Sequence, residues 1–122
     1  GKRVIELPAG LAGDTSEFHG ESLEIAARRE LLEETGYEAK GMKQLVGGPI
    51  SAGFGTEILT FFRATGLKKV NDGGGDHSEE ILVHEVPLAK IERWLLSRED
   101  ESTTIDPKIF VGLYFAHKSS RS

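Results

Sequence analysis

Three glutamates stand close together in the stretch RRELLEETGY, which covers residues 28–37. On a helix, Glu30, Glu33 and Glu34 share a face, and Glu30 with Glu34 forms a like-charged i, i+4 pair that costs about 0.2–0.5 kcal/mol. Mg²⁺ binds carboxylate oxygens and keeps its remaining positions for water and substrate phosphates. A divalent cation would therefore turn the repulsion into a binding site. The alternative is a solvated acidic face on which Arg29 partly balances Glu33.

A helix must carry these carboxylates, and the flanking residues predict one over residues 23–35. Ser22 is a suitable N-cap residue, and Gly36 is well placed to end the helix. Ala27 and Leu31 form an apolar face at i, i+4 spacing. The segment therefore has the pattern of a helix that is partly packed and partly acidic.

The remaining elements alternate between strands, loops and helices. The segment EILTFFRA is nearly continuous in apolar and β-branched residues, which is typical of a central strand. Asp106-Pro107 has the pattern of an N-cap followed by the first helical position, and we expect that helix to reach about Tyr114. The expected strands are residues 3–7, 43–46, 57–64 and 80–86, and a further helix is expected over residues 88–96 with Trp94 in the core. This order predicts a single domain of mixed α/β class over residues 1–122.

Composition excludes several classes of function. A formal net charge of -5 argues against sequence-independent nucleic-acid binding, which needs clustered cations against phosphates. No apolar run approaches the roughly 18 residues that cross a membrane. The chain has no cysteine, which agrees with a reducing compartment, and we expect a cytoplasmic location without nucleic-acid or membrane partners.

Residues 29–37, RELLEETGY, resemble the second half of the Nudix box, which reads Arg-Glu-hydrophobic-any-Glu-Glu-any-Gly-hydrophobic. Glu21 stands at the required seven-residue gap before Arg29. A chance match of this half in such a chain is on the order of 10⁻⁵. The segments ELPAG, SAGFGTE, GGGDHSEEILVHEVPL and DPKIFVGLYF resemble the ADP-ribose pyrophosphatase branch of the family. The resemblance implies an α/β/α sandwich with a mixed sheet.

The resemblance also implies a metal site that binds Mg²⁺, with Mn²⁺ as an alternative. Glu30 and Glu34 would be direct ligands, and Glu21 would complete the cluster. Glu33 would be a further or water-mediated ligand with a catalytic role. The backbone carbonyl that the glycine loop of relatives supplies to the metal corresponds to Ala9 in this chain.

Further roles follow from the same resemblance. Arg29 would orient Glu33 from one turn earlier. A general base is expected from the loop before a late strand, where Glu79 or Glu80 fits and Asp76 is the weaker choice. Glycines 73–75 would let this loop close over the substrate. The alternative is that SEEI is only a polar entry to a strand.

Three residues near the loop GGPISAGFG are implied in substrate binding. Glu57 would hydrogen-bond a ribose hydroxyl, Phe54 would stack on a base, and Gly53 belongs to the same stretch.

The expected activity is hydrolysis of a nucleoside diphosphate linked to another group, with ADP-ribose split into AMP and ribose 5-phosphate. ADP-sugars, GDP-mannose and dinucleotides remain open as substrates. One alternative is a non-catalytic nucleotide-binding or sensor module that keeps the box. The other is a structural role in which the acidic helix meets a basic partner.

Relatives normally carry at least one strand before the segment that corresponds to ELPAG, and this chain is short there. Exposed strand edges invite pairing with another chain. We therefore expect a homodimer, and we expect the chain alone to bind Mg²⁺ but to turn over ADP-ribose poorly.

Overall fold

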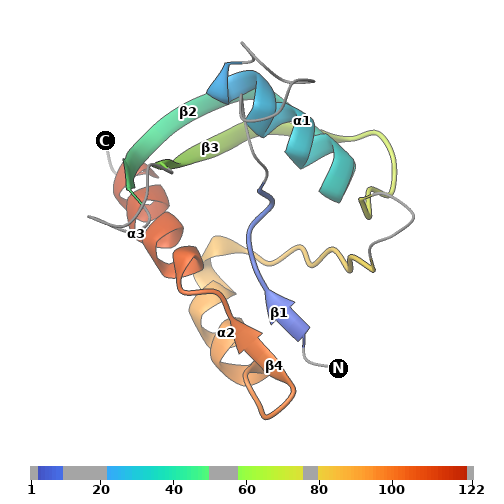
Figure 1. The fold of residues 1–122 in the computed structure, drawn as a ribbon, viewed down its shortest axis with the longest axis vertical. Helices are drawn as coiled ribbons and strands as arrows, with labels where there is room; N and C mark the ends of the chain where they lie inside the picture. Colours follow the sequence, from blue (N-terminus) through green and yellow to red (C-terminus); the bar gives the residue numbers. More distant parts are fainter. Residues whose placement is uncertain (1–2, 10–21, 50–57, 76–79, 121–122) are drawn as a thin grey trace.

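The computed structural model describes residues 3–9, 22–49, 58–75 and 80–120, and its elements confirm a mixed α/β order (Figure 1). A hairpin and the helix that precedes it form one part of the fold, and two further helices with a small sheet form the other. The elements are β1 Arg3–Ile5, α1 Leu23–Thr35, β2 Tyr37–Pro49, β3 Ile58–Lys69, the 3₁₀ turn η1 Leu88–Lys90, α2 Ile91–Arg98, β4 Thr103–Ile105 and α3 Lys108–Ser120.

The strands β2 and β3 form a long antiparallel hairpin. Their pairing runs from Tyr37 opposite Lys69 to Pro49 opposite Ile58, with a register shift between Gln44 and Val46. Residues 43–46 and 58–64 of the predicted strands fall in this hairpin, whose strands extend beyond both predictions. Within the described residues β3 pairs with β2 alone, so the expectation that it is a central strand stays a prediction.

A second, smaller sheet joins distant parts of the sequence. Strand β1 pairs in parallel with β4, with Arg3 opposite Thr103 and Ile5 opposite Ile105. The backbone N–H of Asp106 extends the ladder by donating to the carbonyl of Ile5 at 2.9 Å. The observed strand β1 ends at Ile5, two residues before the predicted end at residue 7.

The predicted strand at residues 80–86 is wrong. These residues have no regular secondary structure and cross the molecule between the hairpin and α2 (Figure 1). Alternating polarity predicts a strand only where a partner strand can pair with it, and none of the described strands pairs with this segment. Its Leu82 is 64% exposed, and the ring of His84 lies 5.0 Å from that of Trp94.

The buried core lies between α2, β4 and α3. Leu95, Ile105 and Ile109 are 1%, 8% and 3% exposed and form one cluster. Trp94 packs against this cluster while partly buried, which supports its expected place in the core. Ile5 packs against it as well, so β1 is tied to the core by side chains and by its ladder.

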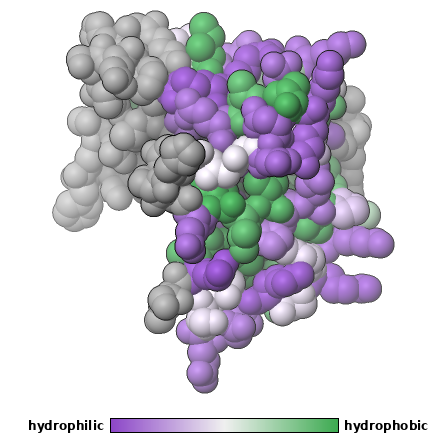
Figure 2. Space-filling view, turned by 90° about the vertical axis from the view of Figure 1, so that its right-hand side faces the viewer, coloured by the Kyte–Doolittle hydropathy of each residue, from purple (hydrophilic) through white to green (hydrophobic). Residues whose placement is uncertain are grey.

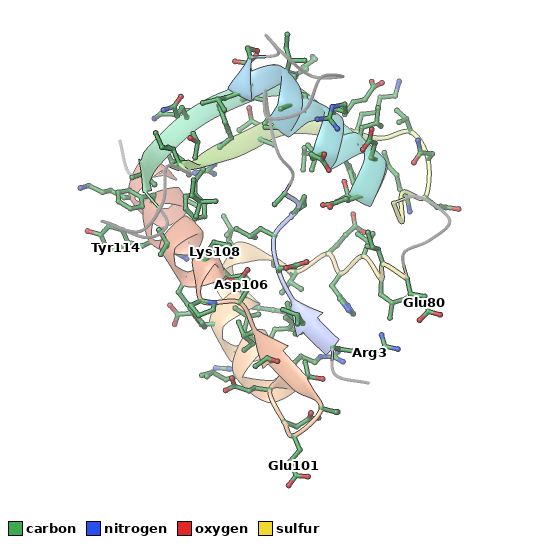
Figure 3. The ribbon with its side chains drawn as sticks, viewed as in Figure 1. Arg3, Glu80, Glu101, Asp106, Lys108 and Tyr114 are labelled. Carbon is green, nitrogen blue, oxygen red and sulfur yellow. The ribbon has the colours of Figure 1, made fainter. Side chains whose placement is uncertain are left out.

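The start of α3 has the predicted local chemistry. The Oδ1 atom of Asp106 accepts from the backbone N–H of Lys108 at 2.9 Å, and the Lys108 ammonium lies 2.9 Å from Oδ2 (Figure 3). Desolvation raises the pKa of Asp106, but the hydrogen bonds and charge of Lys108 outweigh it and lower the pKa. The helix extends to Ser120, well past the predicted end near Tyr114.

Helix α3 lies close to the hairpin. A Cβ atom at Gly112 would stand 3.0 Å from Leu7 and 3.2 Å from Phe61, so this glycine permits the close approach. Arg63 of β3 donates to the carbonyl of Ala116 at 2.9 Å. These contacts connect the two parts of the fold.

We predict that Leu95→Ala lowers the free energy of unfolding by about 2–5 kcal/mol, because it leaves a cavity in the core. The neighbouring Leu96 is 70% exposed, so Leu96→Ala should change it by less than about 0.5 kcal/mol. Urea denaturation of the two variants and the parent measures both values. Equal losses would contradict the location of the core.

Candidate metal and catalytic site

Helix α1 begins and ends where the sequence predicts. The Ser22 hydroxyl accepts from the N–H of Ile25 at 3.2 Å, and Gly36 ends the helix at φ 80°. Arg28 joins α1 to the hairpin, because its Nη1 donates to the carbonyl of Ala39 at 2.5 Å. The glutamates therefore stand in the last two turns of a helix that is fixed to β2.

Arg29 lies between two of these glutamates. Its Nη1 is 2.8 Å from Oε1 of Glu30 and 3.6 Å from Oε2 of Glu33. Glu30 and Arg29 are largely buried, with side chains 17% and 21% exposed, whereas that of Glu33 is 54% exposed. Arg29 is thus within 3.6 Å of Glu33 and is hydrogen-bonded to Glu30, while the expected orienting role stays a prediction.

The segment after β1 meets α1 at Glu34. The backbone N–H of Ala9 donates to Oε2 of Glu34 at 3.1 Å, across 25 positions of sequence. Two residues expected at the metal site therefore lie side by side. No local pattern in the sequence could have predicted this contact.

The glycine-rich stretch after β3 docks on the end of α1. The N–H groups of Gly74 and Gly75 donate to the carbonyls of Glu34 and Glu33 at 2.8 and 2.9 Å. We expected these glycines to let the loop close over a substrate, and that motion stays a prediction. In this structure they are bonded to the helix that carries the carboxylates (Figure 1).

The other predicted site residues are less well placed or lie outside the described chain. Glu80 is exposed and points away from the ribbon (Figure 3). The residues that lie outside the described ranges are Gly53, Phe54, Glu57, Glu79 and Glu21, together with Asp76.

The oxygen donors on α1 fit a hard cation in their chemistry. Glu30 and Glu34 offer carboxylates, and the Ala9 backbone lies beside the second of them. Among the described residues, no group of three acidic, histidine or cysteine side chains is arranged to hold a metal ion. Glu30 is bonded to Arg29, so cation binding would require this carboxylate to share or exchange its partner.

An apolar pocket of about 270 Å³ lies elsewhere, between the far end of the hairpin and α3. From Tyr37, next to the end of α1, to Val46 at the pocket, β2 covers roughly 30 Å of strand at ~3.3 Å per residue. The pocket is lined by Val46, Gly47, Gly48, Leu59, Phe61, Lys108 and Val111. None of the described lining residues belongs to α1, so within the described chain the pocket is separate from the acidic turn. None of the described helices is long and apolar enough to cross a membrane.

Comparison with known proteins gives a family match over most of the chain. The sequence model described as "NUDIX domain" matches residues 2–106. A methanol dehydrogenase activator of Bacillus methanolicus is 36% identical over 107 residues, which is 85% of this chain and 55% of that protein.

Two similar proteins carry the names of pyrophosphatases. An ADP-ribose pyrophosphatase of Mycobacterium tuberculosis is 35% identical over 100 residues, 81% of this chain and 46% of that protein. A GDP-mannose pyrophosphatase of Citrobacter koseri is 32% identical over 120 residues, 97% of this chain and 58% of that protein. The chain spans about half the length of these relatives.

Proposed function

The chain belongs to the Nudix hydrolase family, and from that premise we propose that it hydrolyses a nucleoside diphosphate linked to another group, with Mg²⁺ or alternatively Mn²⁺ as its cofactor. One observation carries the proposal: Glu34, which stands one helical turn after Glu30 on α1, accepts a hydrogen bond from the backbone N–H of Ala9. A helical carboxylate pair and a distant backbone segment are thus brought to one place.

The proposed metal ligands are Glu30 and Glu34, with Glu21 and the carbonyl of Ala9 completing the set and Glu33 as a further or water-mediated ligand. When bound, Mg²⁺ would neutralise charge that develops on the phosphate oxygens and lower the pKa of bound water.

The role of Arg29 in this proposal is to position carboxylates. Its guanidinium is 2.8 Å from Glu30 and 3.6 Å from Glu33, so it can hold the first and attract the second. In the metal-free protein it also offsets part of the repulsion on this face of α1.

Glu79 or Glu80 is proposed as the general base. A base must come within hydrogen-bond distance of the attacking water, either directly or through one further water. Glu80 is exposed in this structure, and the proposal places its carboxylate within reach of that water when substrate is bound.

The proposed substrate class is a nucleoside diphosphate sugar. The names of two relatives contain ADP-ribose and GDP-mannose, which share a diphosphate between a nucleoside and a sugar but differ in base and sugar. We propose ADP-ribose, split into AMP and ribose 5-phosphate, as the first substrate. Phe54, Glu57 and Gly53 are proposed to contact the nucleoside.

A second candidate function is nucleotide binding without turnover. It is supported by the pairing of Glu30 with Arg29, because this ion pair occupies a carboxylate that a catalytic metal would need. Product analysis separates the two functions, because a sensor would bind the nucleotide and leave it intact.

We also propose that the protein forms a homodimer. Large apolar side chains are exposed, among them Leu82 at 64% and Tyr114 at 61%. Figure 2 shows hydrophobic residues gathered at the middle of one face between hydrophilic ones. Exposed apolar areas of this kind are typical of surfaces that bind another protein.

We predict that Glu34→Gln lowers kcat for ADP-ribose or GDP-mannose by about 10² or more, because metal-site electrostatics contribute several kcal/mol. Metal-free stability should stay level or rise slightly, since a like charge is removed. Glu24→Gln in the first turn of the same helix is the control and should keep activity. Activity of Glu34→Gln within about threefold of the parent, or loss of its fold, would argue against a direct ligand.

For the base, either Glu79→Gln or Glu80→Gln should lower kcat by about 10², with little change in Mg²⁺ affinity. Glu85→Gln, an exposed change in the same segment, serves as the matched control. Steady-state kinetics and calorimetric Mg²⁺ titration give the two quantities. If both variants lower kcat only slightly and by the same factor, neither glutamate is the base, and the base would be sought among the glutamates of α1.

The assembly proposal predicts a dimer in analytical ultracentrifugation at micromolar concentration. A stable monomer over that range would refute it.

A further inference from the structure

The last turn of α1 takes its missing hydrogen bonds from a distant loop. The final carbonyls of an α-helix have no partner within the helix. Here the carbonyl of Leu32 accepts from Gly36 at 2.9 Å, while those of Glu33 and Glu34 accept from Gly75 and Gly74. Two of the carbonyls that a helix end leaves unpaired are thus satisfied by residues that follow β3.

This arrangement acts where negative charge is most concentrated. A helix C-terminus carries a partial charge of roughly -0.5, and cationic side chains usually offset it. The last turn of α1 has no basic residue, and it carries Glu33 and Glu34. The N–H groups of Gly74 and Gly75 therefore supply the positive ends of dipoles that this turn lacks.

Asn71 shapes the loop for this contact. Its Oδ1 accepts from the N–H of Gly73 at 2.7 Å, which closes a side-chain turn of the kind that asparagine favours. The N–H groups of Val70 and Asn71 donate to the carbonyl of Gly36 at 2.8 and 3.3 Å. The loop is thus fixed by its own asparagine as well as by the helix.

The two backbones meet so closely that side chains are excluded. A Cβ atom at Gly73 would stand 2.4 Å from the carbonyl carbon of Thr35, and φ at Gly73 is +64°. A Cβ atom at Gly36 would stand 2.0 Å from the carbonyl oxygen of Asn71. Each side of the contact therefore needs glycine.

We propose that residues 70–75 form a clamp that positions the Glu33–Glu34 turn for its cation, with Asn71 as a positioning residue; this rests on the proposed function. Asn71 acts through Gly73 and the loop backbone and is not a ligand. The clamp also limits where the proposed base can go. Gly75 is bonded to the carbonyl of Glu33, and Glu80 follows five residues later, within about 17 Å of extended chain.

The test compares Asn71→Ala with Asp72→Ala. Asp72 belongs to the same loop, but its side chain is fully exposed and lies 3.8 Å from the Lys69 ammonium, so its loss leaves the clamp intact. Asn71→Ser keeps a weaker acceptor for the Gly73 N–H and should restore part of any loss. Mg²⁺ alone is titrated by calorimetry, and amide hydrogen exchange of residues 33–36 is followed in the metal-free protein.

If Asn71 positions the Glu33–Glu34 turn, Asn71→Ala should weaken Mg²⁺ binding about fivefold, which is the effect of one lost hydrogen bond. Amide hydrogen exchange at residues 33–36 should become faster by a similar factor. Asp72→Ala should change neither. In steady-state kinetics at subsaturating Mg²⁺, Asn71→Ala should lower kcat, and saturating Mg²⁺ should restore it. If Asn71→Ala fails to fold, Asn71→Ser carries the comparison and should show an intermediate loss.

Unchanged Mg²⁺ affinity in a folded Asn71 variant would reduce the loop to a structural cap and overturn the proposal, as would a parent protein that binds no Mg²⁺. A parent that binds Mg²⁺ but cleaves no nucleotide would refute the proposed hydrolysis alone. The clamp would then be supported or refuted by affinity and exchange.

Discussion

The C-terminal end of α1 imposes the constraint on which the candidate site depends. A helix end already carries partial negative charge and unpaired carbonyls, and here Glu33 and Glu34 add carboxylates to it. Such a turn is unfavourable unless other groups donate to it. The donors come from two segments. The backbone N–H of Ala9 donates to the Glu34 carboxylate, and those of Gly74 and Gly75 donate to the backbone carbonyls of Glu34 and Glu33. The need for donors at this turn thus explains why two distant segments converge on it.

Features set by neighbouring residues could be predicted from the sequence. The bounds of α1 follow from the hydroxyl of Ser22 and the left-handed conformation of Gly36, and both act within one helical turn. Asp106 at the start of α3 is predictable for the same reason. The acidic face of α1 likewise needs only the period of a helix. In each case the information lies within a few positions of the feature.

Features that depend on distant partners could not be predicted in this way. Residues 80–86 have the composition of a strand, but composition does not say whether a partner strand is present. The length of the hairpin depends on the pairing of Tyr37 with Lys69, which no local signal shows. Glycines 73–75 have a composition that suits either a flexible loop or a close backbone contact. Only the position of α1 distinguishes the two.

The short segment after β1 links the stability of the fold to the candidate site. Ile5 packs against the core cluster and pairs with Ile105, and only four residues later Ala9 donates to Glu34. Between them Leu7 lies against Gly112 of α3. Four residues of extended chain span at most about 14 Å. A displacement of β1 in the core would therefore also displace Ala9, whose N–H contacts the carboxylate. The coupling is reciprocal, because any cation that binds the folded site and not the unfolded chain stabilises the fold. The packing of Ile5 in the core and the contact of Ala9 with the candidate site therefore belong to one short stretch of chain.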